Sequence, residues 1–259
     1  MMETRNPRLQ FIDNLGWMFF DLDIQFLNNL AYNRCSERGR KIDLQVYSWT
    51  EIRLKEKIEN YINNLETTQF YYNLRGKLQT PPISQHLDMM MMRSKSKMKM
   101  VICDIGNIES CKISRLWLSL AIFMKKRFEW IGEIQVFEQY LSATEAQVYK
   151  YFGCIVLSLD EYRRSWQALK PTIFFAPGYS TPLYNNLVKV NWKSNLLSNI
   201  VLFGESINTS ELQIYSHIDV EHSMRYCEAI RSFTKSVRIK TLPEGICLRS
   251  LEDSLEDSS

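Results

Sequence analysis

From residue 100 onward, short apolar runs alternate with helical patterns, and this alternation restricts the fold more than any other feature of the sequence. Five runs have the composition of buried strands, at residues 100–103, 134–137, 154–157, 173–175 and 200–203. Helical patterns occupy residues 113–126, 144–152, 160–169 and 221–233, and a sixth strand is expected at 237–240. Strands joined through helices of this length need crossover connections. The sequence predicts an α/β, Rossmann-like fold: a mainly parallel sheet of five or six strands with helices on both faces, preceded by a helical N-terminal region.

We expect the chain to divide into a helical N-terminal region with a connector (1–88), the α/β domain (98–245) and an acidic tail (246–259). Residues up to about 40 have weak periodicity and predict no element. Ser48 and Glu51 have the spacing of a capping box, which predicts a helix start at Ser48. The apolar face of that helix is expected to pack on the main domain and comprises Leu54, Ile58, Tyr61, Ile62 and Leu65. The pair Pro81-Pro82 is expected to end this region, with residues 85–100 as the connector.

Charge is unevenly distributed, although the net charge of +3 is too small to indicate nucleic-acid binding by itself. Residues 93–99 carry four bases, which either contact phosphate or an acidic partner or keep an edge strand soluble, the interpretation we favour. No aromatic residue alternates with these bases, so nucleic-acid binding is not expected. Residues 250–259 contain four acids and no base. We interpret them as a solvated tail, with a docking peptide or a phosphorylation target as alternatives.

The six cysteines include no Cys-x-x-Cys pair, so neither a metal site nor a disulfide framework is predicted. Cys103 and Cys154 lie within apolar runs and are expected to be buried. Asp13, Asp21 and Asp23 interrupt the first apolar stretch, which argues against a secretory signal, and no run reaches the length of a membrane span. The sequence predicts a cytoplasmic protein, with the nucleus as a second location, and no membrane association.

Polar residues follow the first two strands of the domain. Asp104, Gly106 and Asn107 follow the first strand and Glu138 follows the second. The carboxyl ends of parallel strands form the ligand crevice of open α/β sheets. Only the central glycine of the dinucleotide fingerprint is present, and the acids of this turn repel a pyrophosphate, so the turn is closer to the Asp-x-Gly turn of class I methyltransferases. Glu138 could accept both hydroxyls of a ribose or could be a solvent-facing acid.

The fourth and fifth strands also end in polar residues, and the crevice candidates there are Tyr179, Tyr184, Asn185, Asn186, Glu205 and Ser206. Asparagine side chains could recognise an amide, a purine or a ribose, or could cap backbone groups locally, which we expect for at least one of the two. The three histidines lie outside these loops, and no Gly-x-Ser-x-Gly elbow is present. Enzymatic activity is therefore left open with the balance against it, and no cofactor is assigned.

The second half of the domain also carries a distinctive order of residues. Leu-Tyr-Asn-Asn-Leu at 183–187, Asn191-Trp192 and Leu-Ser-Asn-Ile at 197–200 resemble the sensitivity-to-red-light-reduced (SRR-like) domain family, and the resemblance covers about residues 98–245. The resemblance implies a regulatory protein of circadian rhythm and light signalling in plants. In animals it implies regulation of haem biosynthesis and of clock-gene expression. The family has no established biochemical activity.

The chain departs from the family pattern at the strand ends. Asp104 replaces the first glycine of Gly-Ile-Gly, and Glu138-Gln139 replaces Asp-Pro. Ala-Pro-Gly-Tyr at 176–179 replaces Met-Pro-His-Cys, and Gly-Glu-Ser at 204–206 replaces Gly-Asn-Ser. If the family's function requires that histidine or cysteine, this chain lacks it at Gly178 and Tyr179. The pattern indicates a divergent member.

Three hypotheses therefore remain. We favour a regulatory SRR-like protein that acts through a small-ligand crevice, a protein partner, or both. The second is a methyltransferase-like or other nucleoside-binding enzyme that uses the turn around Gly106 together with Glu138. The third is a non-catalytic interaction scaffold that uses the N-terminal region and the acidic tail.

Overall fold

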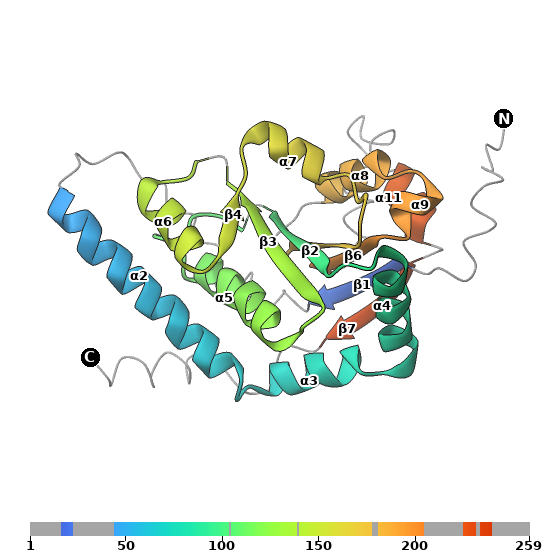
Figure 1. The fold of residues 1–259 in the computed structure, drawn as a ribbon, viewed down its shortest axis with the longest axis horizontal. Coiled ribbons are helices and arrows are strands. Elements are labelled where there is room, and N and C mark those ends of the chain that lie inside the picture. Colours follow the sequence, from blue (N-terminus) through green and yellow to red (C-terminus); the bar gives the residue numbers. More distant parts are fainter. Residues whose placement is uncertain are drawn as a thin grey trace, which may run out of the picture.

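A single parallel sheet organises the molecule (Figure 1). The computed structural model describes residues 17–22, 44–103, 105–138, 140–177, 181–204, 225–231 and 234–239. Its seven strands have the order β4-β3-β2-β5-β6-β1-β7, and every neighbouring pair is parallel. The strands are β1 (Trp17–Leu22), β2 (Met98–Cys103), β3 (Ile131–Phe137), β4 (Cys154–Val156), β5 (Thr172–Ala176), β6 (Ile200–Gly204) and β7 (Thr234–Ile239). The predicted α/β fold class is confirmed.

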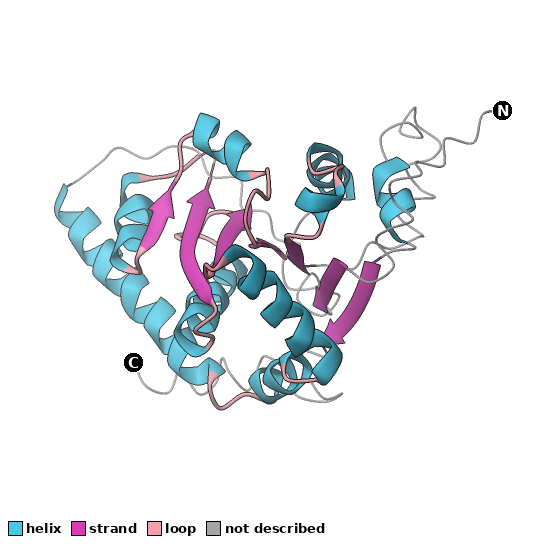
Figure 2. Cartoon of the chain, turned by 45° about the vertical axis from the view of Figure 1, so that its right-hand side comes forward, coloured by secondary structure: helices cyan, strands magenta, loops and turns pink. Residues whose placement is uncertain are grey.

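Helices cover both faces of the sheet (Figure 2). One face carries α5 (Lys112–Arg127) and α6 (Ala143–Tyr151), with α2 (Leu44–Leu65), α3 (Gln69–Leu78) and α4 (Pro81–Ser94) packed around them. The opposite face carries α7 (Leu159–Ser165), α8 (Thr181–Val190), α9 (Ser194–Leu197) and α11 (Arg225–Arg231). This three-layer arrangement is the one that βαβ crossovers produce.

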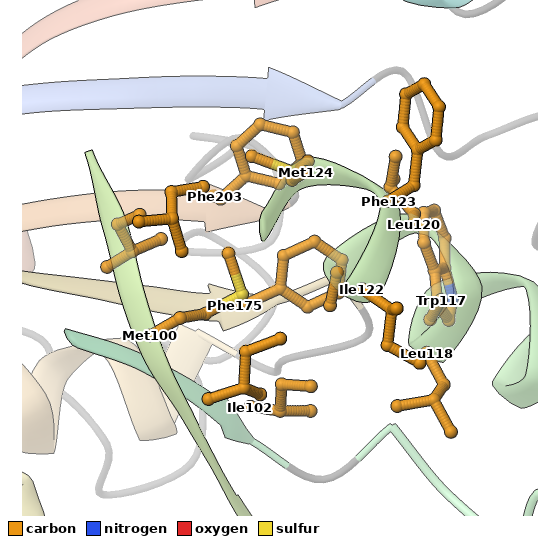
Figure 3. Packing of buried hydrophobic residues seen from close by; sticks show 14 of the residues in the cluster. Met100, Ile102, Trp117, Leu118, Leu120, Ile122, Phe123, Met124, Phe175 and Phe203 are labelled. Carbon is orange, nitrogen blue, oxygen red and sulfur yellow. The ribbon is translucent and has the colours of Figure 1, made fainter. Parts of the chain in front are cut away.

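Side-chain alternation along the central strands divides the core into two clusters. Met100 and Ile102 face the α5 side, whereas Val101 and Cys103 face the α8 side. Phe175 lies on the α5 side, where its ring stacks on that of Phe203 with centroids 5.4 Å apart (Figure 3). Both faces of these strands are buried, which explains why they are continuous apolar runs in the sequence. Burying each large side chain contributes roughly 1.5–3 kcal/mol to stability.

Strand β1 is an element that the sequence did not predict. It lies between β6 and β7, with Phe20 opposite Phe203 on one side and Val237 on the other. The strand sequence, Trp-Met-Phe-Phe-Asp-Leu, is short and stands apart from any helical pattern, so periodicity alone does not reveal it. The expected sixth strand at 237–240 corresponds to β7, and β1 brings the sheet to seven strands.

The start predicted for the first long helix was wrong. Helix α2 begins at Leu44, so Ser48 lies within it and does not cap it. The predicted apolar face is buried at Leu54, Ile58 and Ile62, and it packs against α5. The Ser119 hydroxyl on α5 lies 2.7 Å from the carbonyl oxygen of Arg115 on its own helix and 3.3 Å from that of Ile58, so its single proton is shared between the two helices.

The predicted connector was also wrong, because most of it is helical. Pro81 and Pro82 occupy the first turn of α4, where proline costs no helical hydrogen bond. Helix α4 continues to Ser94 and ends at Lys95, which has a left-handed φ of 51°. Four consecutive methionines hide its periodicity in the sequence, although Met90 is buried.

Candidate functional site

The order of the strands fixes where a ligand crevice would lie. If β1 is left aside, the strand order is the doubly wound one. Strands β2 and β5 are neighbours at its centre; the chain continues from β2 to β3 and β4 on one side and from β5 to β6 and β7 on the other. Ligands of such sheets bind outside the carboxyl ends of the two strands at this switch point. The loop after β2 and the start of α8 border this position. Of the predicted crevice residues, Asp104, Tyr179, Glu205 and Ser206 lie outside the described residues.

The structure brings Gly106 and Glu138 together, as their positions after neighbouring strands predict. The backbone N–H of Gly106 donates to Glu138 Oε1 at 3.2 Å. Gly106 has φ +84°, a conformation that residues with a Cβ rarely adopt, and an added Cβ would lie 3.1 Å from Ser114 Oγ. The positive φ therefore favours glycine at this turn, and a Cβ would in addition crowd the Ser114 hydroxyl.

Two further acids fix the same loop: Glu109, one of the acids that the sequence analysis placed at this turn, and Glu145, which it missed. The N–H of Ile108 donates to Glu145 Oε1 at 2.7 Å, and Ser142 Oγ donates to Glu109 Oε1 at 2.6 Å. Glu145 also forms a capping box with Ser142 at the start of α6. The Ser-x-x-Glu spacing of these two residues was a signal that could have identified Glu145.

Arg115 completes the support of the loop from α5. Its Nη1 donates to the carbonyl oxygens of Ile108 and Glu109, both at 2.9 Å. Asn107 stabilises the same turn, because its Oδ1 accepts from the N–H of Ser110 at 2.7 Å and from the Ser110 hydroxyl at 2.8 Å. The side chain predicted as a ligand contact therefore has a structural role in the turn.

These contacts determine which ligands the loop suits. In dinucleotide-binding proteins, N–H groups of the first loop and helix start face a pyrophosphate. Here the N–H groups of Gly106 and Ile108 already donate to carboxylates. A phosphate would have to displace these carboxylates and would meet the negative charge of Glu109 as well. The loop geometry therefore favours a neutral or cationic ligand over a dinucleotide.

Burial and charge shift the titration of the groups around this loop. Burial raises the pKa of Glu145, although the hydrogen bonds from the Ser142 and Ile108 backbones oppose the shift. Burial also raises the pKa of Tyr149, and the charges of Glu138 and Glu145 raise it further. At Cys111, burial acts to raise the pKa, but hydrogen bonds from Ser114 and Ile113 and the charge of Arg115 outweigh it, so that the pKa is lowered.

Tyr184 and Asn185 are buried on α8, and their contacts are internal. The Tyr184 hydroxyl donates to the carbonyl oxygen of Ala176 at 3.0 Å. The Oδ1 of Asn185 accepts from the N–H groups of Tyr226 and Cys227, at 3.0 and 3.2 Å, at the start of α11. Asn185 thus caps the start of α11, 41 residues further along the chain, and not the local backbone as expected for at least one of the asparagines, whereas Asn186 is exposed. Ligand binding by these residues stays a prediction.

Other expectations concern metals, cysteines and membranes. Within the described residues, no group of three His, Cys, Asp or Glu side chains is placed to hold a metal ion. Cys103 and Cys154 are buried, as their apolar surroundings predict. None of the helices that the structure describes combines the length and apolar character needed to cross a bilayer.

The fold and this loop define a doubly wound α/β protein whose switch-point loop is held by carboxylates. A model of the SRR1 domain matches residues 74–254, and the chain belongs to this family. The matched region begins within α3, so α4 lies inside it, ahead of the boundary at residue 98 that the motifs indicated.

Two relatives support this assignment. The chain is 37% identical over 200 residues to Protein SENSITIVITY TO RED LIGHT REDUCED 1 of Arabidopsis thaliana. These residues make up 77% of this chain and 72% of the relative. It is 30% identical over 187 residues to the SRR1-like protein of Mus musculus. These residues make up 70% of this chain and 74% of the relative. No solved structure matches the chain significantly. The chain is therefore a regulatory SRR-like protein.

Proposed function

We propose that this regulatory protein acts in light signalling, circadian rhythm and clock-gene expression, and in the regulation of haem biosynthesis, in the cytoplasm and the nucleus. The observation that carries the light-related part is the 37% identity to an Arabidopsis protein named for reduced sensitivity to red light. The rhythm and haem parts rest on the family resemblance of the sequence motifs. A protein partner, a small ligand in the switch-point crevice, or both would transmit the signal.

A complementation experiment tests this function. The chain is produced in an Arabidopsis line that lacks the relative, and we measure seedling growth under red light, the period of a rhythmic reporter, total haem and the location of a fluorescent fusion. Restored red-light growth and period would support the proposal. A chain that accumulates normally but restores neither response would contradict it.

A second candidate function is nucleoside binding, which the position of Glu138 in the strand order supports. It follows β3, the second strand of the doubly wound order, where an acid can accept the hydroxyls of a ribose. Glu138 also contacts the N–H of Gly106, which places its carboxylate beside the loop that a nucleoside would approach. The engaged N–H groups favour a nucleoside without a pyrophosphate, such as S-adenosylmethionine, as in a methyltransferase-like enzyme.

Thermal denaturation tests this second candidate. The chain is heated with S-adenosylmethionine, NAD, NADP, ATP or haemin, and the variant Glu138→Ala is compared with Glu133→Ala, an exposed acid on the same strand. A ligand at a hundred times its dissociation constant adds about 2.7 kcal/mol of stability. Each kcal/mol raises the melting temperature by about 2–4 °C. A rise with S-adenosylmethionine that only Glu138→Ala abolishes supports nucleoside binding, and no rise with any compound contradicts it.

A further inference from the structure

The edge of the sheet opposite the candidate crevice carries a concentrated positive charge. We call this region the basic surface and define it by seven exposed bases in the last turns of α3, α4 and α5 and in the loop after α4: Arg75, Lys77, Arg93, Lys95, Lys97, Lys126 and Arg127. Four acids flank these bases in the sequence, with Glu66 just before α3, Asp88 on α4, Glu129 just after α5 and Glu133 in β3, and Glu66 forms an ion pair with Arg127. The surface therefore has a net positive charge.

A groove of about 480 Å³ lies within the basic surface, between α3, α4 and the residues that join α5 to β3. Apolar side chains form much of it: Tyr71, Leu78, Leu87, Phe128 and Trp130. The rings of Phe128 and Trp130 stack with centroids 5.5 Å apart, and both remain partly exposed. Arg75, Arg127 and one acid, Asp88, also line the groove, so it combines apolar surface with an excess of positive charge.

Helix dipoles alone do not account for this arrangement. A base in the last turn of a helix is stabilised by the carbonyl groups there, so the sign of each charge is expected. The dipole does not require three helix ends to converge on one groove with exposed aromatic rings. The N–H of Met98 donates to the carbonyl oxygen of Trp130 at 2.8 Å, which brings the short loop after α4 next to the groove.

The chain contains a segment with the complementary chemistry. Residues 250–259, Ser-Leu-Glu-Asp-Ser-Leu-Glu-Asp-Ser-Ser, carry four acids, no base and two leucines four residues apart. Leucines suit the apolar floor of the groove, and the acids suit the bases around it. Exposed opposite charges attract over about 8 Å at physiological salt.

The chain is also long enough for this contact. Strand β7 ends at Ile239, and α3 packs beside β7, with Val237 in the same apolar cluster as Leu74. Twelve residues lead from Ile239 to Leu251, and an extended chain spans roughly 40 Å over that length at about 3.3–3.6 Å per residue. Because the strands are parallel, Ile239 lies at the carboxyl edge of the sheet, so the segment would first run back past the six residues of β7, roughly 20 Å, and the remaining length is available to reach the groove.

We propose that residues 250–259 dock in cis on the basic surface, with Leu251 and Leu255 in the groove and the acids against the surrounding bases. The docked segment occupies the surface that an acidic partner would otherwise contact. A partner with more negative charge would displace the segment and expose the surface, whereas phosphorylation of its serines would add negative charge and strengthen the contact.

Carbodiimide cross-linking of the full chain tests the contact, because this reagent joins an amine to a carboxylate only where the two touch. The monomer band is digested and its cross-links are mapped by mass spectrometry. We expect links from the acids of residues 250–259 to Lys77, Lys95, Lys97 or Lys126. They should be lost at 1 M salt, where the Debye length falls to about 3 Å.

Charge-reversal variants supply the matched control. Arg75→Glu with Lys77→Glu should weaken the links to the remaining lysines of the basic surface, whereas Lys189→Glu with Lys193→Glu, exposed lysines on the other face of the sheet, should leave them unchanged. Equal linkage to Lys189 and Lys193, an absence of links, or links found only between two copies would each overturn docking in cis.

Lysine acetylation gives an independent readout, and no residue of the described core is substituted for it. The four acids of residues 250–259 are replaced by their amides, and acetylation is compared with that of the unchanged chain. Lys77, Lys97 and Lys126 should react roughly two- to fivefold faster, as expected when exposed ion pairs are lost. Unchanged rates at all three lysines would contradict the proposal.

Discussion

The hydroxyl of Tyr184 donates a hydrogen bond of 3.0 Å to the carbonyl oxygen of Ala176, the last residue of β5. This bond fixes α8 against the carboxyl end of the strand. It also fills the space beside Gly204, which is paired with Ala176 at the end of β6. A Cβ at Gly204 would overlap the Tyr184 hydroxyl and lie 2.5 Å from the Ala176 carbonyl oxygen.

Gly204→Ala should therefore lower the free energy of unfolding by about 1–3 kcal/mol, the usual cost of overpacking. Tyr184→Phe should cost about 0.5–1.5 kcal/mol through the lost hydrogen bond. The double variant should cost less than the sum, because the phenyl ring removes one of the overlapping atoms. Urea denaturation measures all three. Gly76→Ala is the control, since nothing lies within 4 Å of its added Cβ. Costs that add within about 0.3–0.5 kcal/mol would contradict the coupling.

The two capping boxes predict opposite pH dependences. Burial raises the pKa of Glu145 from its ordinary value of 4.5, so its contribution to stability is present below pH 4.5 and is lost as pH rises through the raised pKa. Hydrogen bonds from Ser158 lower the pKa of the exposed Glu161, so its contribution is present above pH 4.5 and is lost as pH falls through the lowered pKa.

Urea unfolding of Glu145→Gln and Glu161→Gln across this pH range checks both signs. The stability of the unchanged chain relative to Glu145→Gln should decrease as pH rises. Its stability relative to Glu161→Gln should increase. If the relative stability changed with pH in the same direction for both variants, the difference in burial between Glu145 and Glu161 would not set their pH dependence.

Among the described cysteines, Cys111 should react first with iodoacetamide at neutral pH. Its pKa is lowered and its side chain is partly exposed, whereas burial raises the pKa of Cys154 to about 12. The thiolate is the reactive form, so the rates should follow this order. Mass spectrometry of the labelled peptides measures the rates. Ser114→Ala removes a hydrogen bond to the thiolate and should slow labelling of Cys111, and equally fast labelling of Cys154 would argue against the assignment.

Asn191→Asp should be strongly destabilising. The Asn191 side chain is fully buried; its Oδ1 accepts from the N–H of Ala168, and its Nδ2 donates to the carbonyl oxygens of Trp166 and Leu187. A carboxylate would place negative charge against two carbonyl oxygens, at a cost of about 3–5 kcal/mol. Denaturation should show little change for Asn195→Asp, which is exposed. A cost below about 1 kcal/mol at Asn191 would refute this role.

The central strands could be predicted because both of their faces are buried, so their sequences are continuous apolar runs such as the one ending at Cys103. Helix α4 was missed because Pro81-Pro82 was taken as an end where it is a start, and because four methionines conceal which side is buried. The prediction for the candidate site brought Gly106 and Glu138 together because both follow neighbouring strands. The contacts of Glu109 with Ser142 and of Arg115 with the loop backbone were not predicted. They depend on the folded geometry of the loop, which leaves no pattern in the local sequence.

The place of β1 in the sheet has a consequence for how the chain is made. Strand β1 pairs with β6 and β7, so Met18 can pair with Val201 and Lys235 only after these residues have been synthesised. During synthesis the first strand is completed long before either neighbour exists, and such distant pairings form late. Within the described sheet, β7 pairs with β1 alone. We therefore expect β1, the first of the described strands to be synthesised, to be among the last to pair, together with β7.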